Sequence, residues 1–309
     1  MLVGKLCRNA AIGLAAMAIA AAVAVPAAGA RVSSVLVYSC GPGFANLCQI
    51  NADGSAQKRL TTTGSPTVYA KKYNSPSLSR DGKKLAYLLG YRLHVRNLVT
   101  GRETGFITNN AFLARISPDG TKVGDLEEFP DVSVPLGWVS TACVFNSNGS
   151  GPKAGRDCEG STGSFGFTND NRLLASVSDL FDQTYDRYDK GICLLDPVRS
   201  GCDAFLAADP GYDLSDPALS PSEKVLAVTR SVPGQTQGEI ALYDYATGKL
   251  IGALTTGTTD SGPVWSPDGS KLAFVRGAAT GSPRIYTIAA KGGSARQLVA
   301  HGRAVTWGR

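Results

Sequence analysis

The stretch Gly262-Pro-Val-Trp-Ser-Pro-Asp-Gly-Ser-Lys-Leu-Ala-Phe-Val275 decides the fold. Its centre, Ser-Pro-Asp-Gly, is a tight-turn sequence, because Pro fixes φ, Asp hydrogen-bonds within its own turn and Gly accepts a positive φ. Apolar runs lie on both sides, so the stretch predicts two antiparallel strands joined by a hairpin turn. Two further short strands are expected over 284–288 and 296–299, with a Gly-Gly turn between them.

The same unit recurs along the chain, with clear copies over 215–255 and 75–101 and weaker copies that begin at Ala114 and Gly166. In each copy we define a marker as the residue before the Ser or Thr that opens the turn. The markers are Leu78, Ile116, Phe167, Leu219 and Trp265, at steps of 38, 51, 52 and 46 residues. Four short strands per unit of roughly 40–50 residues are typical of a propeller blade. A β-sandwich is the alternative, although a sandwich does not require the same turn in every unit.

The two ends of the chain supply a sixth blade. Trp307 follows Trp265 by 42 residues, in a terminal segment, 303–309, that copies the first strand of a blade with nothing after it. Residues 34–38 resemble a second strand with no first strand before it. Pairing the two segments completes a blade and removes the edges that an open ring would expose. The sequence therefore predicts an all-β, six-bladed propeller with four-stranded antiparallel blades, closed by the C-terminal strand.

Residues 1–30 are expected to be a signal peptide and residues 31–309 a single propeller domain. Lys5 and Arg8 precede an apolar run over 10–25, and small residues follow at 28–30. An uncleaved anchor is the alternative, but the run is shorter than the roughly twenty residues that a membrane span needs. We expect a periplasmic or secreted protein, monomeric and with no membrane span after cleavage. The formal net charge of +6 comes without a Lys/Arg cluster, which argues against a nucleic-acid partner.

Six cysteines follow the expected cleavage site, and an even number suits disulfides in an exported protein. Their spacing favours pairs within one repeat, because cysteines in different blades rarely reach the Cα separation of ~4.4–6.8 Å that a bridge requires. The expected pairs are Cys40–Cys48, Cys143–Cys158 and Cys193–Cys202. The chain has no CxxC motif and two histidines, a composition that argues against zinc.

The repeat resembles that of the TolB-like propellers. The resemblance rests on Trp-Ser-Pro-Asp-Gly-x-Lys-Leu-Ala-Phe at 265–274, Ile-Tyr-x-Ile at 285–288 and Gly-Gly at 292–293, and it covers essentially the whole chain after residue 30. It implies an exported scaffold that binds a partner on one face. The N-terminal α/β domain of TolB is not expected, because the first blade starts within a few residues of the expected cleavage site.

The binding face is expected to be the one with the longer, more variable loops. The long loops are expected over 61–75, 178–190 and 207–216. The Ser-Pro-Asp-Gly turn and the later Gly turn share one side of each blade, whereas the loop between strands two and three and the link to the next blade share the other. Exposed aromatic residues beside mixed charge suit a protein or glycan surface. The residues predicted to bind the partner are Tyr69, Tyr73, Phe181, Tyr185, Tyr188 and Tyr212. Capping of blade edges is their alternative role.

Signals for metal binding or catalysis are few. Asp179, Asp182, Asp186 and Asp189 offer oxygen ligands for a structural calcium ion, the one cofactor considered, but their spacing is not that of an EF-hand, and a solvated acidic loop is the alternative. The chain has no Gly-x-Ser-x-Gly elbow, and His94 and His301 lie in separate repeats, so no catalytic residue is predicted.

Three functions fit this pattern. The main hypothesis is a non-enzymatic scaffold that binds a protein or cell-envelope partner through its variable-loop face. The alternative is a secreted glycan-active hydrolase or lyase that uses carboxylates at the mouth of the channel. A subunit of an envelope complex is the third.

Overall fold

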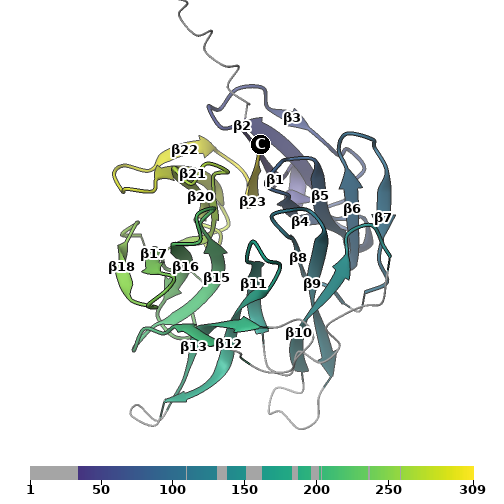
Figure 1. Ribbon diagram of the computed structural model, residues 1–309. Helices are drawn as coiled ribbons and strands as arrows, with labels where there is room; N and C mark the ends of the chain where they lie inside the picture. Colours follow the sequence, from purple (N-terminus) through teal and green to yellow (C-terminus); the bar gives the residue numbers. More distant parts are fainter. Residues whose placement is uncertain are drawn as a thin grey trace, which may run out of the picture. The chain divides into compact units, whose positions relative to one another are not determined.

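The computed structural model describes residues 34–108, 110–130, 138–150, 162–182, 187–195, 202, 204–235, 237–257 and 259–309. The expected signal peptide, residues 1–30, lies outside the described residues. The strands form six antiparallel sheets, arranged as the blades of a propeller (Figure 1). This arrangement confirms the predicted fold.

The blades are numbered in chain order, and each is a sheet of consecutive strands except blade 1, which also takes in the last strand. Blade 1 contains β23 (Arg303–Gly308), β1 (Val35–Cys40), β2 (Asn46–Asn51) and β3 (Lys58–Arg59); blade 2 contains β4 (Tyr73–Leu78), β5 (Lys84–Leu89), β6 (Arg92–Asn97) and β7 (Glu103–Gly105); blade 3 contains β8 (Leu113–Ile116), β9 (Lys122–Pro130) and β10 (Trp138–Asn146). Blade 4 contains β11 (Thr162–Phe167), β12 (Leu173–Asp182), β13 (Arg187–Leu195) and β14 (Ala204–Ala207); blade 5 contains β15 (Asp213–Leu219), β16 (Val225–Ser231), β17 (Glu239–Asp244) and β18 (Leu250–Ala253); blade 6 contains β19 (Asp260–Trp265), β20 (Lys271–Arg276), β21 (Arg284–Ala289) and β22 (Arg296–Val299). Blade 3 has three strands among the described residues, and the stretch 151–161 that follows it is not described.

The C-terminal strand closes the ring, as the sequence predicts. β23 pairs antiparallel with β1, and Trp307 lies opposite Leu36. β23 is the innermost strand of blade 1, and β1, β2 and β3 follow outward from it. The two ends of the propeller are thus joined by a hydrogen-bonded ladder instead of being left as open edges.

The predicted hairpin turn has the same geometry in all five copies. In blade 6 the Ser266 hydroxyl donates to Asp268 at 2.6 Å and accepts the N–H of Lys271 at 2.9 Å, while Gly269 takes a φ of 72°. In two copies the Gly position holds another residue, Asn171 at φ 69° in blade 4 and Glu223 at φ 55° in blade 5. The backbone of the turn is therefore kept even where the residue that best tolerates a positive φ is missing.

Hydroxyl side chains link the innermost strands of neighbouring blades. An innermost strand has one edge that pairs with no strand, so its backbone N–H groups need other acceptors. A Ser or Thr on the neighbouring innermost strand provides them. The bonds are Leu78 N–H to Thr306 Oγ1 at 2.9 Å, Ala114 N–H to Ser75 Oγ at 2.8 Å, Ile116 N–H to Ser77 Oγ at 3.0 Å and Asp216 N–H to Ser164 Oγ at 2.7 Å.

The apolar core lies between the blades. Leu126 of blade 3 packs with Phe165 of blade 4, and Leu174 of blade 4 packs with Tyr243 of blade 5; all four are fully buried or nearly so. Each blade thus buries both of its faces against its neighbours, which explains the continuous apolar runs in the middle strands.

Two of the three expected disulfides are present. Cys40–Cys48 joins β1 to β2 with a Cα separation of 5.8 Å, and Cys193–Cys202 has a Cα separation of 5.5 Å. Cys143 is buried on β10, while Cys158 lies outside the described residues, so their pairing stays a prediction. None of the helices in the described part of the chain is long and apolar enough to cross a membrane.

Candidate functional site

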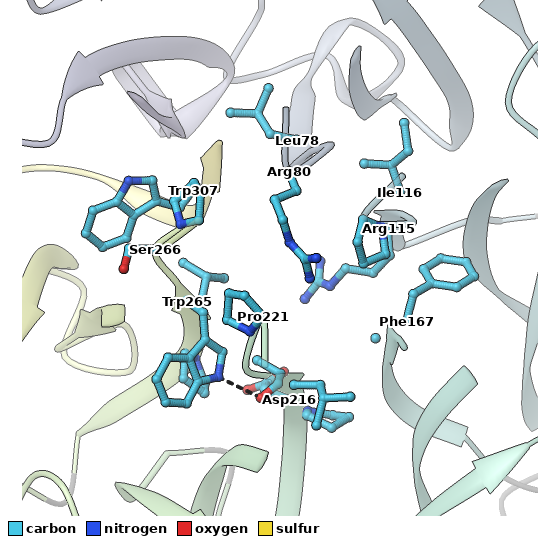
Figure 2. Close-up of a pocket in the computed structure, with 18 residues that line it drawn as sticks. Leu78, Arg80, Arg115, Ile116, Phe167, Asp216, Pro221, Trp265, Ser266 and Trp307 are labelled. Carbon is cyan, nitrogen blue, oxygen red and sulfur yellow. Dashed lines mark hydrogen bonds between the residues drawn. The ribbon is translucent and has the colours of Figure 1, made fainter. Parts of the chain in front are cut away.

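The six markers meet at one end of the central channel. Leu78, Ile116, Phe167, Leu219, Trp265 and Trp307 all line a cavity of about 150 Å³, here called the narrow cavity (Figure 2). Each marker lies near the end of an innermost strand, so the sixfold repeat places one such side chain per blade around the axis. In the sequence these positions served only to count the blades. In the structure their side chains also form part of the wall of the narrow cavity.

Arg80 reaches across the turn side of the narrow cavity. Its Nη2 donates to Asn169 Oδ1 at 2.6 Å, which links the turns of blades 2 and 4 although these blades are not neighbours. The N–H of Asn169 donates in turn to Glu223 Oε1 at 2.6 Å. Burial lowers the pKa of Arg80, and the Glu223 carboxylate opposes this shift. Protein side chains therefore extend over this end of the channel.

A second cavity, of about 520 Å³ and here called the wide cavity, lies at the other end of the channel. Its wall includes Phe44 from the turn after β1, Tyr69 and Phe112 from links between blades, and Ala278 from the turn after β20. Links and loops between second and third strands share one side of every blade. The wide cavity therefore opens on the variable-loop face, which is the face that the sequence predicts to bind a partner.

Arg115 and Asp216 line both cavities, so they mark the neck where the two cavities meet. Burial lowers the pKa of Arg115, and the Asp216 carboxylate opposes this shift. No ion pair joins them among the described residues. Asp216 Oδ2 instead accepts the Thr229 hydroxyl at 2.9 Å and the N–H of Gly262 at 3.2 Å. The neck thus contains one cation and one anion, and no ion pair joins them among the described residues.

A β-bulge in the innermost strand directs Asp216 toward the axis. Asp216 has a φ of 50°, and the register between β15 and β16 shifts at this point. Three other blades have a left-handed residue at the same distance from the marker: Ser75 at φ 48°, Gly262 at φ 62° and Ala304 at φ 48°. Bulges of this kind change the direction of a side chain and are common beside functional sites.

Arg115 and Asp216 were not predicted from the sequence, although each departs from the repeat in a way that the sequence shows. Arg115 stands one position before its marker, where the other five blades have Ser77, Gly166, Ala218, Val264 and Thr306. Asp216 stands three positions before its marker, where the other blades have no charged residue. Aligning the repeats position by position would have shown each residue as the one charge in its column.

The predicted aromatic residues have different surroundings. Tyr69 lines the wide cavity, and its ring centroid is 4.3 Å from that of Tyr91. Tyr73 packs against Tyr87, with ring centroids 5.7 Å apart. The Tyr212 ring lies under the guanidinium carbon of Arg230, 3.4 Å from the ring centroid. Of the three, Tyr69 contributes to a cavity, while Tyr73 and Tyr212 make contacts within their own blades.

The stretch 178–190 was expected to be a long loop, and that expectation is wrong. β12 continues to Asp182 and β13 begins at Arg187, so most of this stretch belongs to a hairpin in which Phe181 lies opposite Tyr188. Asp179 and Asp189 belong to the same two strands. Tyr185 and Asp186 lie outside the described residues, as do the positions of the other side chains in this stretch. The calcium and aromatic predictions at this hairpin stay predictions.

A buried acidic cluster lies in blade 3, outside the channel. Ligand atoms of Asp125, Glu127 and Cys143 lie within 4.8 Å of one another. The first two residues are on β9 and the third is on β10, and all three are buried. Carboxylate and thiolate donors at this spacing are compatible with a metal ion.

The carboxylate pair that a glycan hydrolase would use is not found in the described wall of the channel. Asp216 is the one carboxylate among the described residues that line the two cavities. Glycosidases use two carboxyl groups about 5–10 Å apart on either side of the scissile bond. The described geometry offers a charged neck, with Arg115 and Asp216, and an aromatic mouth.

Solved structures match over most of the chain, whereas no protein-family model and no curated protein matches the sequence. TolB from Acinetobacter baumannii is 18% identical with a TM-score of 0.67, over 89% of this chain and 66% of that one. A putative TolB from Agrobacterium tumefaciens is 17% identical with a TM-score of 0.59, over 88% and 91% of the two chains. An oligogalacturonate lyase in complex with manganese is 16% identical with a TM-score of 0.52, over 83% and 71%.

These similarities concern the fold, since all three identities are below 20%. This chain spans 66% of the length of the A. baumannii TolB. The six sheets, the closure by β23 and the match to two TolB structures agree with the resemblance seen in the repeat. The chain is a six-bladed propeller with the TolB-like fold.

Proposed function

We propose that this chain is an exported, non-enzymatic propeller scaffold that binds a protein or cell-envelope partner through its variable-loop face. The observation that carries the proposal is the wide cavity, which opens on this face and is lined by Phe44, Tyr69 and Phe112. Concave sites with aromatic walls and a few polar groups are typical of ligand and partner recognition.

An exposed apolar rim beside the wide cavity supports a protein partner. Ile107 is 93% exposed, and Val68, Tyr69 and Tyr91 are 40–48% exposed. The rim is continuous around Tyr91, because the tilted ring of Tyr69 packs against its ring and the Thr108 hydroxyl donates to its carbonyl at 2.6 Å. Contiguous exposed apolar residues rimmed by polar ones mark interaction sites on soluble proteins.

Export is part of the proposal. Two disulfides join cysteines within single blades, and such bridges form and persist in oxidising compartments. The charged and apolar segments of residues 1–30 fit a signal peptide. A periplasmic or secreted location agrees with both features.

A matched pair of exposed aliphatic residues tests the proposed face. Ile107 follows β7 on the variable-loop side, whereas Val99, 72% exposed, lies in the β6–β7 turn on the opposite side of the same blade. A photocrosslinking residue at position 107 is expected to capture a partner from the native envelope, and one at position 99 is not. Ile107→Asp should abolish co-purification of that partner, while Val99→Asp should leave it unchanged. Equal capture from both positions, or from neither, would contradict the proposed face.

A further inference from the structure

The wall of the wide cavity has polar atoms that no protein group satisfies. Three buried oxygen atoms on this wall have no hydrogen-bond partner: Ser39 Oγ, Asn74 Oδ1 and Gln237 Oε1. Ser39 is 2% exposed. Buried polar groups in folded proteins are nearly always paired, because an unpaired group loses its bonds to water without replacement. Three residues with such groups line one cavity, so rotation of their side chains toward a polar ligand bound there would supply the missing partners.

Arg115, at the neck, has unused hydrogen-bond donors. A guanidinium carries five N–H donors in a fixed planar fork. Nη1 of Arg115 donates to the Ala114 carbonyl at 3.0 Å. Among the described residues, this carbonyl is the one hydrogen-bond acceptor of the Arg115 side chain. The described ion pairs do not include Arg115. A planar fork with free donors in a confined channel matches a carboxylate, which accepts two parallel bonds from it.

The charge of the wide cavity favours a single negative charge at the neck. The described wall carries Lys72, Arg115 and Arg303 against Asp216, a balance of 3 − 1 = +2. Asp216 faces the same neck as Arg115, so a dianion bound there would meet a nearby carboxylate. A monoanion is attracted by Arg115 and repelled less by Asp216. Lys72 and Arg303 add to the attraction, since they line the same cavity.

The rest of the wall suits an apolar body attached to that anion. Phe44, Tyr69 and Phe112 supply aromatic surface. The volume, about 520 Å³, lies in the range of small-molecule sites, which is about 300–1,000 Å³.

We propose that the wide cavity binds a carboxylate attached to an apolar body, with the carboxylate on the Arg115 guanidinium and the body against Phe44, Tyr69 and Phe112. This inference rests on the proposed function and deepens it, because it names the chemistry that the same face recognises. The carboxylate belongs either to a free small molecule or to a side chain or C-terminus of the partner.

Phenylacetate is the probe, and phenylacetamide, which has the same shape without the charge, is its control. Trp265 and Trp307 line the narrow cavity beside Arg115, so tryptophan fluorescence of the full chain reports on the neck. We expect saturable binding of phenylacetate and at least about tenfold weaker binding of phenylacetamide, because a charge-assisted bidentate pair is lost. Phenyl phosphate, a dianion, should bind more weakly than phenylacetate.

Variants separate the anion site from general effects of charge. Arg115→Met should weaken phenylacetate binding by about tenfold or more, and Arg115→Lys, which keeps the charge but loses the fork, by about threefold or more. Arg284→Met removes one exposed cation outside the cavity and should leave the affinity unchanged. Ser39→Ala removes an unpaired buried hydroxyl and should weaken binding without lowering the melting temperature. If Arg115→Met fails to fold, Arg115→Lys and Ser39→Ala decide the question.

Equal affinity for phenylacetate and phenylacetamide, unchanged binding in Arg115→Lys and Ser39→Ala, or tighter binding of phenyl phosphate would overturn the inference. If phenylacetate displaces the partner crosslinked from position 107, the carboxylate is the partner's; if it binds without displacing the partner, the ligand is a free small molecule. Failure of phenylacetate to bind while Ile107→Asp still abolishes partner capture rejects this inference and leaves the proposed function standing. Binding of phenylacetate without any partner captured at position 107 rejects the proposed function alone.

Discussion

Leu36 and Trp307 are direct partners across β1 and β23, although 271 residues separate them in the sequence. The indole N–H of Trp307 also donates to Ser34 Oγ, and Thr306 Oγ1 accepts the N–H of Leu78 from blade 2. The last strand of the chain therefore bonds to blade 1 on one side and to blade 2 on the other. Closure of the ring depends on this one strand.

Deletion of residues 303–309 should open the ring. It removes β23, exposes the β1 edge and leaves the N–H of Leu78 without its acceptor. We expect the truncated protein to aggregate or to lose cooperative unfolding, measured by size-exclusion chromatography and thermal melting. A monomer with an unchanged melting transition would show that closure by β23 does not hold the propeller together.

Gly82 and Gly101 both have a positive φ, of 71° and 75°, but they differ in the space around them. A Cβ at Gly82 would lie 1.8 Å from the Arg309 carbonyl oxygen, whereas one at Gly101 would have nothing within 4 Å. Gly101→Ala should therefore cost about 1 kcal/mol of unfolding free energy, the backbone strain alone. Gly82→Ala should cost about 2 kcal/mol more, because the C-terminal backbone must move.

Urea unfolding of the two variants measures this difference directly. Equal losses of stability in Gly82→Ala and Gly101→Ala would mean that the C-terminal residue moves aside at no cost. The comparison tests the placement of Arg309 against the turn of blade 2, where its N–H donates to the Arg80 carbonyl at 3.1 Å.

The sequence predicted the parts of the fold that repeat. The Ser-Pro-Asp-Gly sequence determines the backbone conformation of its own turn. Its copies therefore predicted the turns, the number of blades and the closing strand. The degraded copy at 168–171 still forms the turn, because Asn171 tolerates the left-handed conformation that Gly adopts elsewhere. The hairpin at 178–190 was missed, because its aspartates and tyrosines resemble a solvated loop rather than a strand.

The cavities were not predictable in the same way. Ser39, Asn74 and Gln237 come from three different parts of the ring and share no spacing, so only closure of the ring brings them to one wall. Arg115 and Asp216 depart from the repeat, so the similarity between the copies does not point to them. Repetition predicts a scaffold, whereas the site consists of the residues that break the repetition.

Arg276 and Asp260 form a bidentate ion pair, with Nε 2.6 Å from Oδ1 and Nη2 2.8 Å from Oδ2. Asp260 is fully buried, and its hydrogen bond to Arg276 raises the pKa of the guanidinium. Arg276→Met would leave a buried carboxylate without its cation and should cost about 3 kcal/mol of unfolding free energy. Arg284→Met, at an exposed position, should change it by less than about 0.5 kcal/mol.

The double variant Asp260→Leu/Arg276→Met separates two contributions to the free energy of unfolding, that of the ion pair and that of the packing of the Arg276 side chain. Removing both charges should restore most of the stability lost in Arg276→Met, because no unpaired carboxylate remains. A double variant as unstable as the single one would assign the loss to the contact between the Arg276 side chain and the Tyr286 ring, whose centroid is 4.6 Å from the guanidinium carbon.

Asp119 links the pH dependence of stability to the repeated turn. Burial alone would raise the pKa of its carboxyl, but the Ser117 hydroxyl, the N–H of Thr121 and the Asn171 amide donate to it and lower the pKa to about 2. The folded pKa thus lies below the ordinary value of 3.8, and the unfolded chain takes up the proton first as the pH falls. This contribution to stability is complete above about pH 4 and is lost as the pH falls toward about 2.

Asp119→Asn removes this titration and should flatten the fall of unfolding free energy between about pH 4 and pH 2. The variant should also be less stable than the parent at neutral pH, because the ionised acceptor is lost. Part of the slope should remain, since the pKa values of Asp81 and Asp268 in the equivalent turns are also lowered. Glu128→Gln, at an exposed position on β9, is the control and should leave the slope unchanged. Urea unfolding at several pH values measures both slopes, and identical slopes for the parent and Asp119→Asn would show that this turn does not contribute to acid sensitivity.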